Sequence, residues 1–312
     1  MKQKSVLVVG YGSIGVRHAE VLSVLGCRVA IVSQQKIEKY PSYSLIAQAI
    51  DTESPDYIVI ANATILHGRT LMDIRSAGYE GDVLVEKPLV SQLDSKAITT
   101  DLNSYVGYNL RFHPTLQRLK QLIGAETVLS VQAYVGQYLP DWRPGRDYRD
   151  SYSASSADGG GVLRDLSHEL DLVLWLFGDW IRVAANGGHY SKLEIDSDDL
   201  QSVLLVTRDC PNLCIQMNYL DRNTRRFLII NTDEHTIHAD LISGALKIDG
   251  IIENYSFEHN QTYKNMHESV LSKKPVGLCS FADGVAVMSL IHAIEDASEQ
   301  QEWIRNSIQV HG

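Results

Sequence analysis

Short apolar runs alternate with helix-length amphipathic segments along the first third of the chain. Residues Ser5–Val9 form a Val-rich run typical of a buried strand, and apolar residues then recur at helical spacing over 16–25. Further strands are expected at 27–32, 57–61, 83–85 and 105–108, and further helices at 44–50 and 67–77. Short strands that alternate with helices predict an α/β fold with a doubly wound parallel sheet.

After Arg111 this alternation gives way to runs in which polar and apolar residues alternate with a period of two. The stretches 201–207, 213–219 and 227–231 have this pattern, with polar turns and no helix between them, which predicts a mostly antiparallel sheet. Helices are expected at 114–123, 162–177 and 282–294, a long alternating segment at 127–138, and a final strand at 303–310. We therefore expect two domains: residues 1–111 with the parallel sheet, and residues 112–312 as an α+β domain with an open, mostly antiparallel sheet.

The composition excludes several classes of protein. The chain has 312 residues, of which 44% are hydrophobic and 21% charged, as in folded proteins large enough for two cores. Its formal net charge of −10 disfavours a nucleic-acid partner. The apolar stretches are far shorter than the roughly 20 residues of a membrane span, and the first one stops at Gly10, too early for a signal peptide. We predict a cytoplasmic protein with no membrane partner.

The cysteines and histidines do not suggest a metal site. The four cysteines are scattered, without a second closely spaced pair, so free core thiols in a reducing compartment are expected; they are Cys27, Cys210, Cys214 and Cys279. His168-Glu169 begins like a zinc-protease motif, but position 172 is Leu rather than His.

A G-x-G-x-x-G string stands between the first strand and the first helix, the context in which such a string binds a dinucleotide. Gly10 permits the tight turn, Gly12 lets the backbone approach a pyrophosphate, and Gly15 allows close packing of helix on strand. With Ser13 and Ile14, the helix start supplies N–H groups and a positive dipole. The alternative is a glycine turn without a ligand.

The residues after the second strand bear on the choice between NAD and NADP. The stretch 33–36 reads Ser-Gln-Gln-Lys, and no acid occurs before Glu38. An acid there selects NAD, whereas Ser33 and Lys36 can hold a 2′-phosphate, which favours NADP. Alternatively, Ser33 and Gln34 bind the ribose hydroxyls without discriminating.

Two further groups of residues have side chains suited to proton transfer. Lys87, in Glu86-Lys87-Pro88, follows an expected strand at the edge where open α/β sheets bind ligands, and can donate to a substrate oxygen. Asp165, His168 and Asp171 follow one another at i, i+3 spacing on an expected helix, so that two carboxylates and an imidazole share a face. The alternatives are a surface lysine and a solvated salt-bridge cluster.

Together with segment 106–114, these motifs resemble the Gfo/Idh/MocA oxidoreductases, named after glucose-fructose oxidoreductase and inositol dehydrogenase. The resemblance covers nearly the whole chain in the right order. It implies an N-terminal Rossmann domain (1–111) that binds NAD or NADP, and a C-terminal domain (112–312) for substrate binding and oligomerisation, with the substrate between them. A homo-oligomer, dimer or tetramer, is implied as well.

The resemblance also implies roles for individual residues. Lys87, before a cis proline, assists proton transfer, His168 is the general base, and Asp165 completes the catalytic group. Asn62, His67 and Glu86 fall at the cofactor and Arg111 at the substrate; Asn62-Ala63 replaces the family's usual Thr-Pro, whereas a histidine at position 67 is common. The family spaces its aspartate and histidine i to i+4, but here the spacing is i to i+3, and the i+4 rule would put Arg164 in the aspartate's place.

The stretch 137–149 is dense in arginines and aromatic residues. Trp142 can stack on the apolar face of a sugar, and three arginines offer bidentate donors to phosphate or carboxylate; they are Arg143, Arg146 and Arg149. This stretch resembles family members associated with surface-polysaccharide sugars. The alternative is that its arginines and aspartates pair with each other.

These observations favour an NAD(P)-dependent oxidoreductase that moves a hydride to or from a sugar, a cyclitol or a nucleotide-activated sugar. Two alternatives remain open. One is a regulator or scaffold that binds the cofactor without turnover, and the other is a reductase of a non-sugar substrate such as a linear tetrapyrrole or an imine.

Overall fold

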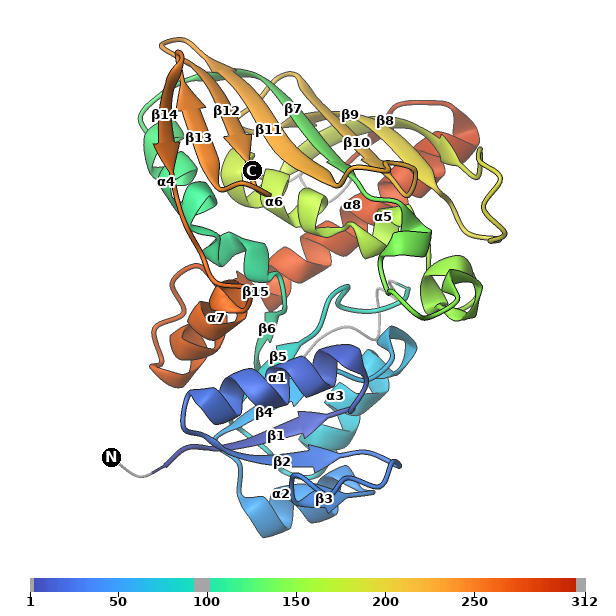
Figure 1. The fold of residues 1–312 in the computed structure, drawn as a ribbon, viewed down its shortest axis with the longest axis vertical. Coiled ribbons are helices and arrows are strands. Elements are labelled where there is room, and N and C mark those ends of the chain that lie inside the picture. The colour runs from blue at the N-terminus through green and yellow to red at the C-terminus, as the bar shows by residue number, and fades with distance from the viewer. Residues whose placement is uncertain (1–2, 93–101, 307–312) are drawn as a thin grey trace. The chain divides into compact units, whose positions relative to one another are not determined.

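The computed structural model describes residues 3–92 and 102–306, and the chain forms two compact units (Figure 1). Unit 1 comprises Met1–Phe112 and Glu258–Met288, and unit 2 comprises His113–Phe257 and Ser289–Gly312. The division expected from the sequence, between residues 111 and 112, did not include the return of residues 258–288 to unit 1.

Unit 1 contains a seven-stranded sheet in the order β15-β6-β5-β4-β1-β2-β3. All neighbouring strands are parallel except β15, which is antiparallel to β6. The parallel sheet expected from the sequence is confirmed. Its strands are β1 (Ser5–Val9), β2 (Arg28–Val32), β3 (Ser42–Tyr43), β4 (Tyr57–Ile60), β5 (Asp82–Val85), β6 (Asn103–Val106) and β15 (Cys279–Ser280).

Apolar side chains on both faces of the central strands explain why this sheet is covered by helices. Every residue of β1 and of β4 is buried, as parallel strands in α/β proteins usually are. The helices of unit 1 are α1 (Ser13–Val24), α2 (Ile46–Glu53), α3 (His67–Ser76) and α7 (Gln261–Leu271), with the 3-10 turns η1 (Thr64–Leu66) and η2 (Asn109–Phe112).

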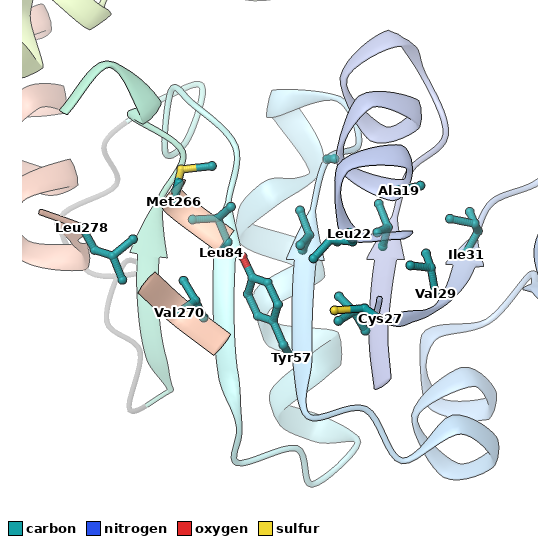
Figure 2. Packing of buried hydrophobic residues seen from close by; sticks show 14 residues of the cluster. Ala19, Leu22, Cys27, Val29, Ile31, Tyr57, Leu84, Met266, Val270 and Leu278 are labelled. Atoms are coloured by element: carbon teal, nitrogen blue, oxygen red, sulfur yellow. The ribbon is translucent and has the colours of Figure 1, made fainter. Parts of the chain in front are cut away.

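Helix α7 belongs to the core of unit 1 although it follows the antiparallel strands in sequence. Figure 2 shows Met266 and Val270 of α7 beside Leu84 and Tyr57 of the sheet, and all four are buried in one apolar cluster. Leu22 of α1 joins the same cluster. Burial of this apolar face against the sheet is the physical reason why residues 258–288 return to unit 1.

Unit 2 contains a nine-stranded sheet in the order β14-β13-β12-β11-β7-β10-β9-β8-β16. Strands β7 and β10 are parallel and the other neighbours antiparallel, so the mostly antiparallel sheet expected here is confirmed. The strands are β7 (Val128–Gly136), β8 (Trp180–Gly188), β9 (Leu200–Thr207), β10 (Leu213–Asn218), β11 (Arg225–Thr232), β12 (Thr236–Asp240), β13 (Ala245–Ile248), β14 (Ile251–Asn254) and β16 (Ile304–Arg305). Of the expected strand 303–310, residues 307–310 lie outside the described part of the chain.

The helices of unit 2 leave one face of its sheet open. Along β9, Val203 and Leu205 are buried, whereas the side chain of Leu204 between them is 48% exposed. This alternation is what a sheet covered on one face produces. The helices are α4 (Pro114–Ile123), α5 (Val162–Asp165), α6 (His168–Phe177) and α8 (Phe281–Gln300), which begins in unit 1, and the 3-10 turns are η3 (Leu139–Asp141), η4 (Tyr148–Asp150) and η5 (Tyr152–Ala154).

The single helix expected over 162–177 is wrong. The chain leaves helical geometry at Leu166, whose φ and ψ are −97° and 21°, so α5 ends at Asp165 and α6 begins at His168. Asp165 and His168 therefore do not lie on one continuous helix.

Candidate functional site

The glycine turn between β1 and α1 has the geometry expected of a pyrophosphate-binding turn. Gly10 has a φ of +102°, and a Cβ added there would lie 2.6 Å from the backbone of Ala61. A Cβ at Gly15 would collide with the carbonyl oxygen of Gly10, so this glycine lets α1 pack closely on the turn. Gly12 is different, because a Cβ there would meet nothing within 4 Å. Backbone atoms after β4 crowd Gly10, and Gly10 itself crowds Gly15, whereas Gly12 faces open space.

Helix α1 begins at this turn with donors available to an anion. Ser13 is its first residue, Ile14 packs against the apolar cluster, and no side chain caps the helix at Gly12. The first N–H groups of a helix have no partner within it, and its dipole favours negative charge there. This end of α1 can therefore bind a phosphate group.

The residues after β2 are polar and mostly exposed. The Ser33 hydroxyl accepts a hydrogen bond from the Gln35 N–H at 3.1 Å. The side chain of Lys36 is 88% exposed, and its ammonium lies 3.3 Å from the Glu38 carboxylate. An exposed pair of this kind contributes little energy, so Lys36 can exchange Glu38 for another anion.

Asn62 and His67 follow β4, and His67 contacts the segment that contains Lys87. The Asn62 amide donates to the Thr70 hydroxyl at 2.8 Å, while its buried Oδ1 accepts no hydrogen bond from the described residues. The buried His67 ring lies 3.2 Å from the carbonyl oxygens of Asn62, through Nε2, and of Leu89, through Nδ1. Burial lowers the pKa of His67, which favours the neutral ring. His67 thus joins the end of β4 to the segment after β5.

Glu86, Lys87 and Pro88 follow β5, and the Lys87–Pro88 peptide bond is cis. Glu86 is buried, with Oε1 accepting from His18 Nε2–H at 2.8 Å and Oε2 accepting from the Lys87 N–H at 3.1 Å. Burial alone would raise the pKa of Glu86, but its hydrogen bond and electrostatic interaction with His18, together with the Lys87 charge, outweigh it and hold this pKa below its usual value. A buried carboxylate therefore lies directly before Lys87.

Arg111 lies in η2 and is almost fully buried. Its guanidinium donates to the Leu278 carbonyl oxygen at 3.2 Å and to the Asp283 carboxylate at 2.9 Å. These contacts connect η2 to the start of α8 within unit 1, and they account for the burial of the charge.

Asp165 of unit 2 is a buried carboxylate held by tyrosines. The Tyr219 hydroxyl donates to Asp165 Oδ2 at 2.7 Å, and the Tyr152 hydroxyl also forms a hydrogen bond with Asp165. Burial, reinforced by the nearby Asp165 charge, raises the pKa of both phenols and keeps them protonated as donors. His168 is the first residue of α6 and is half-buried.

The other acids near His168 are structural. Glu169 is buried and pairs with the Arg226 guanidinium at 2.7 Å, while Asp171 is buried within α6. The single helical face that the sequence predicted for Asp165, His168 and Asp171 is wrong, because the helix is interrupted between Asp165 and His168. The alternative of a solvated salt-bridge cluster does not fit either, because both carboxylates are buried.

Asp198 is a titratable group beside α5 that the sequence did not single out. Its Oδ2 accepts from the Leu163 N–H at 3.1 Å and from the Gln201 amide at 3.2 Å. A Cβ at Gly161, where φ is +111°, would collide with this carboxylate. Burial raises the pKa of Asp198 to about 6, although both hydrogen bonds favour the charged form. An acidic stretch at 196–199 was visible in the sequence, but nothing in it distinguished Asp198.

A cavity of about 350 Å³ lies beneath the arginine-rich stretch of unit 2. Trp142, Arg143 and Arg146 line it together with Tyr148. The Arg143 guanidinium also lies over the Tyr152 ring, 5.5 Å from its centroid. The Trp142 ring packs edge-on against Tyr219, with the ring centroids 5.1 Å apart. The cavity is therefore connected to Asp165 through the Tyr219 side chain.

Arg149 does not line this cavity. Its guanidinium pairs with the Asp147 carboxylate at 2.5 Å and with Glu194 at 2.7 Å. The hydrogen bonds from Arg149 lower the pKa of the Asp147 carboxyl to about 2. These contacts match the alternative in which an arginine and an aspartate of the stretch pair with each other.

Metal-binding clusters and membrane-spanning helices are both absent from residues 3–92 and 102–306. No group of three or more His, Cys, Asp or Glu side chains there is arranged to hold a metal ion. None of the helices in these ranges is long and apolar enough to cross a membrane.

The fold of the whole chain is similar to that of several solved structures. One solved structure, GenD2 from gentamicin A biosynthesis in complex with NAD, is 22% identical over 98% of this chain and 97% of its own, with a TM-score of 0.80. Levoglucosan dehydrogenase in complex with NADH is 17% identical over 97% and 99%, with a TM-score of 0.82. The WlbA dehydrogenase from Bordetella pertussis, in complex with NADH and UDP-GlcNAcA, is 19% identical over 98% and 99%, with a TM-score of 0.78.

Sequence comparisons give a narrower result. No curated protein matches the sequence. The model of the GFO/IDH/MocA C-terminal domain matches residues 116–237. This match agrees with the resemblance seen in the sequence, and the whole chain shares the fold of the solved structures above.

Proposed function

We propose that this protein is an NAD(P)-dependent dehydrogenase or reductase that acts on a CH–OH or C=O carbon of a sugar, a cyclitol or a nucleotide-activated sugar. One observation carries the proposal: the glycine turn leaves Gly12 facing open space at the uncapped start of α1. Lys87 follows β5 of the same parallel sheet, whose strands end at one common edge. Open α/β sheets bind their ligands at this edge.

The residues of unit 1 suit a dinucleotide cofactor. The start of α1 and Gly12 would hold its pyrophosphate, Ser33 and Lys36 its adenosine ribose, and Asn62 with His67 would lie on the nicotinamide side. The buried, unused Oδ1 of Asn62 is an acceptor available to a ligand. When bound, the nicotinamide supplies the hydride acceptor or donor. Since no acid precedes Glu38, we propose that NADP binds at least as tightly as NAD.

The chain's own residues would handle the proton. His168 would take the proton of a substrate hydroxyl as general base, and the Lys87 ammonium would donate a hydrogen bond to a substrate oxygen. Asp165 takes part by fixing the tyrosines around α5 rather than by exchanging a proton, because its carboxylate already accepts from Tyr219 and Tyr152. A residue in this orienting role does not need the i to i+4 spacing to His168 that the family pattern has.

The cavity of unit 2 indicates an anionic sugar as substrate. Trp142 offers an aromatic face for sugar C–H groups, and Arg143 with Arg146 offers donors to a carboxylate or phosphate. The cocrystallised ligand of the WlbA dehydrogenase, UDP-GlcNAcA, has both features. We therefore propose a uronic acid or nucleotide-activated sugar of the kind used in surface polysaccharides.

A turnover assay with a substrate panel tests this proposal. The purified protein is incubated with NAD or NADP and each of a set of UDP-sugars, uronic acids, cyclitols and neutral aldoses, and reduced nicotinamide is measured. We expect turnover with at least one anionic sugar, reduced by roughly 10² to 10⁴ in Lys87→Ala and in His168→Ala, with cofactor binding unchanged in both. Turnover with no member of the panel, or wild-type kcat in His168→Ala, contradicts the proposal.

We also propose that the open face of the unit 2 sheet joins copies of this chain into a dimer or tetramer. On this face Leu204 is half exposed, and the Tyr134 and Phe227 rings stack 5.2 Å apart. Exposed apolar patches of this kind are often interaction sites. Light scattering should detect an oligomer that Leu204→Glu dissociates.

The buried Cys27, Cys210 and Cys279 are free thiols, which suits the cytoplasm as the proposed compartment.

A further inference from the structure

Four buried side chains form a continuous row of hydrogen bonds through the core of unit 1. Tyr57 Oη lies 3.1 Å from His267 Nδ1, His267 Nε2 lies 2.9 Å from His18 Nδ1, and His18 Nε2 lies 2.8 Å from Glu86 Oε1. These residues come from β4, α7, α1 and the end of β5, and all four are buried. The row thus ends on the residue next to Lys87, and nothing in the proposed chemistry uses its other three members.

When Glu86 is ionised and both histidines are neutral, the row has a single direction of donation. A carboxylate only accepts, so His18 must carry its proton on Nε2, and a neutral His18 then accepts at Nδ1. His267 must in turn donate from Nε2 and accept at Nδ1, where only the Tyr57 hydroxyl can donate. One negative charge and three neutral side chains satisfy every bond in the row.

We propose that Tyr57, His267 and His18 are positioning residues that hold the Glu86 carboxylate in one orientation and, through it, fix the backbone at Lys87. The proposal rests on the proposed function insofar as Lys87 is the residue being positioned. The second oxygen of Glu86 accepts from the Lys87 N–H at 3.1 Å, so a rotation of the carboxylate would break that bond. Gly107 makes room for this carboxylate, since a Cβ there would lie 2.7 Å from Glu86 Oε1.

The surroundings of the row favour a neutral His267 and a protonated Tyr57. Burial, with the neighbouring His18 as a smaller cause, lowers the pKa of His267 well below its usual value. Burial raises the pKa of Tyr57 well above its usual value, and the charges of Asp82 and Glu86 add to this. The charged or titratable groups that face the row are Asp82, Tyr79, Cys27, Lys87, His67 and the Tyr263 ring.

The histidine protonation states can be measured directly by nitrogen-15 NMR of the imidazole rings. At about pH 8 we expect both His18 and His267 to be neutral with the proton on Nε2, unlike a ring that exchanges freely between tautomers. A proton on Nδ1 of either ring, or an imidazolium at either position, overturns the proposed direction of the row.

Removal of a single oxygen atom tests the link to Lys87. In Tyr57→Phe the ring is retained but His267 Nδ1 loses its donor, which leaves an unsatisfied buried acceptor at the far end of the row and weakens its hold on Glu86. We expect the Lys87 amide hydrogen to exchange about fivefold faster with solvent, as for the loss of one hydrogen bond. Tyr79→Phe is the matched control, because it removes a buried hydroxyl from the same core that donates instead to the Asp82 carbonyl oxygen at 3.1 Å.

The comparison of these two variants separates positioning from general stability. Both should be folded by circular dichroism, and both should bind NADH as the wild type does. Equal Lys87 amide exchange in Tyr57→Phe and Tyr79→Phe overturns the positioning role. None of these measurements requires turnover, so the proposed function can fail in the substrate panel while this result stands, and the reverse is also possible.

Discussion

Tyr219 donates a hydrogen bond to Asp165 at 2.7 Å while its ring packs edge-on against Trp142, with the centroids 5.1 Å apart. One side chain thus connects the wall of the unit 2 cavity to the carboxylate beside the candidate base. The phenol stays protonated because burial and the Asp165 charge raise its pKa well above the usual value. Tyr219 therefore acts as a permanent donor rather than as an acid.

Removal of this hydroxyl should affect stability before it affects substrate binding. Tyr219→Phe leaves the buried Asp165 carboxylate short of a donor, which should lower the free energy of unfolding by about 1–3 kcal/mol. The ring that packs on Trp142 remains, so KM should change little. Urea denaturation measures the effect, with Tyr190→Phe as control, since its exposed hydroxyl contacts only Asn186. Equal unfolding midpoints for the two variants would be inconsistent with the structural role of Tyr219.

Asp198 should make the stability of unit 2 depend on pH. Its pKa is raised to about 6 in the folded protein, above that of an unfolded aspartate, so the native state binds more protons between about pH 4 and pH 6. The unfavourable contribution is absent below the unfolded pKa and fully present above pH 6. Asp198→Asn should therefore raise the free energy of unfolding by about 2 kcal/mol at neutral pH and hardly change it near pH 4. A stabilisation that is the same at both pH values contradicts the assignment.

Substitutions at Lys36 and at Glu38 should change the affinity for NADPH in opposite directions. If Lys36 binds the 2′-phosphate, Lys36→Ala should weaken NADPH binding by about tenfold and leave NADH unchanged. Glu38→Gln removes the carboxylate that lies 3.3 Å from the Lys36 ammonium and should tighten NADPH binding instead. Calorimetry with both nucleotides measures these effects. NADH binding at least tenfold tighter than NADPH in the wild type would refute the NADP preference.

The arginines of residues 137–149 should fall into two groups, those that bind substrate and those that only hold the loop together. Arg146 lines the cavity, so Arg146→Ala should raise KM for an anionic sugar by about tenfold with little change in kcat, because the contact exists in ground and transition states alike. Arg149 is paired with Asp147 and Glu194, so Arg149→Ala should leave KM nearly unchanged. Steady-state kinetics of the two variants measure these effects. Equal KM values for Arg146→Ala and the wild type would mean that residues 137–149 have a purely structural role.

The elements that the sequence predicted well are those whose partners lie nearby in the chain. The strand, glycine turn and helix from Ser5 to Val24 have a local signal, because the turn itself requires Gly10 and Gly15. The break between α5 and α6 has no such signal, since Leu166 and Ser167 are tolerated in helices.

Contacts between residues far apart in the chain could not be predicted from the sequence. His18 and His267 are 249 residues apart, and neither carries a pattern that identifies the other. The apolar face of α7 does not identify its partner either. An amphipathic sequence predicts that one face of a helix is buried, but it does not say which element buries it. Arg111 looked like a substrate ligand by resemblance, whereas its contacts with Asp283 and the Leu278 carbonyl oxygen appear only in the fold.

The central claim is that a nicotinamide cofactor binds at the turn from Gly10 to Gly15, and a titration with NADH and NADPH tests it most directly. Gly12 has an ordinary φ of −77° and open space for a Cβ, so Gly12→Ala should fold normally but bind both nucleotides at least about tenfold more weakly. Val24→Ala, at the exposed opposite end of α1, is the control and should bind like the wild type. Nicotinamide fluorescence that shows no binding by the wild type, or equal binding by Gly12→Ala, would contradict the account.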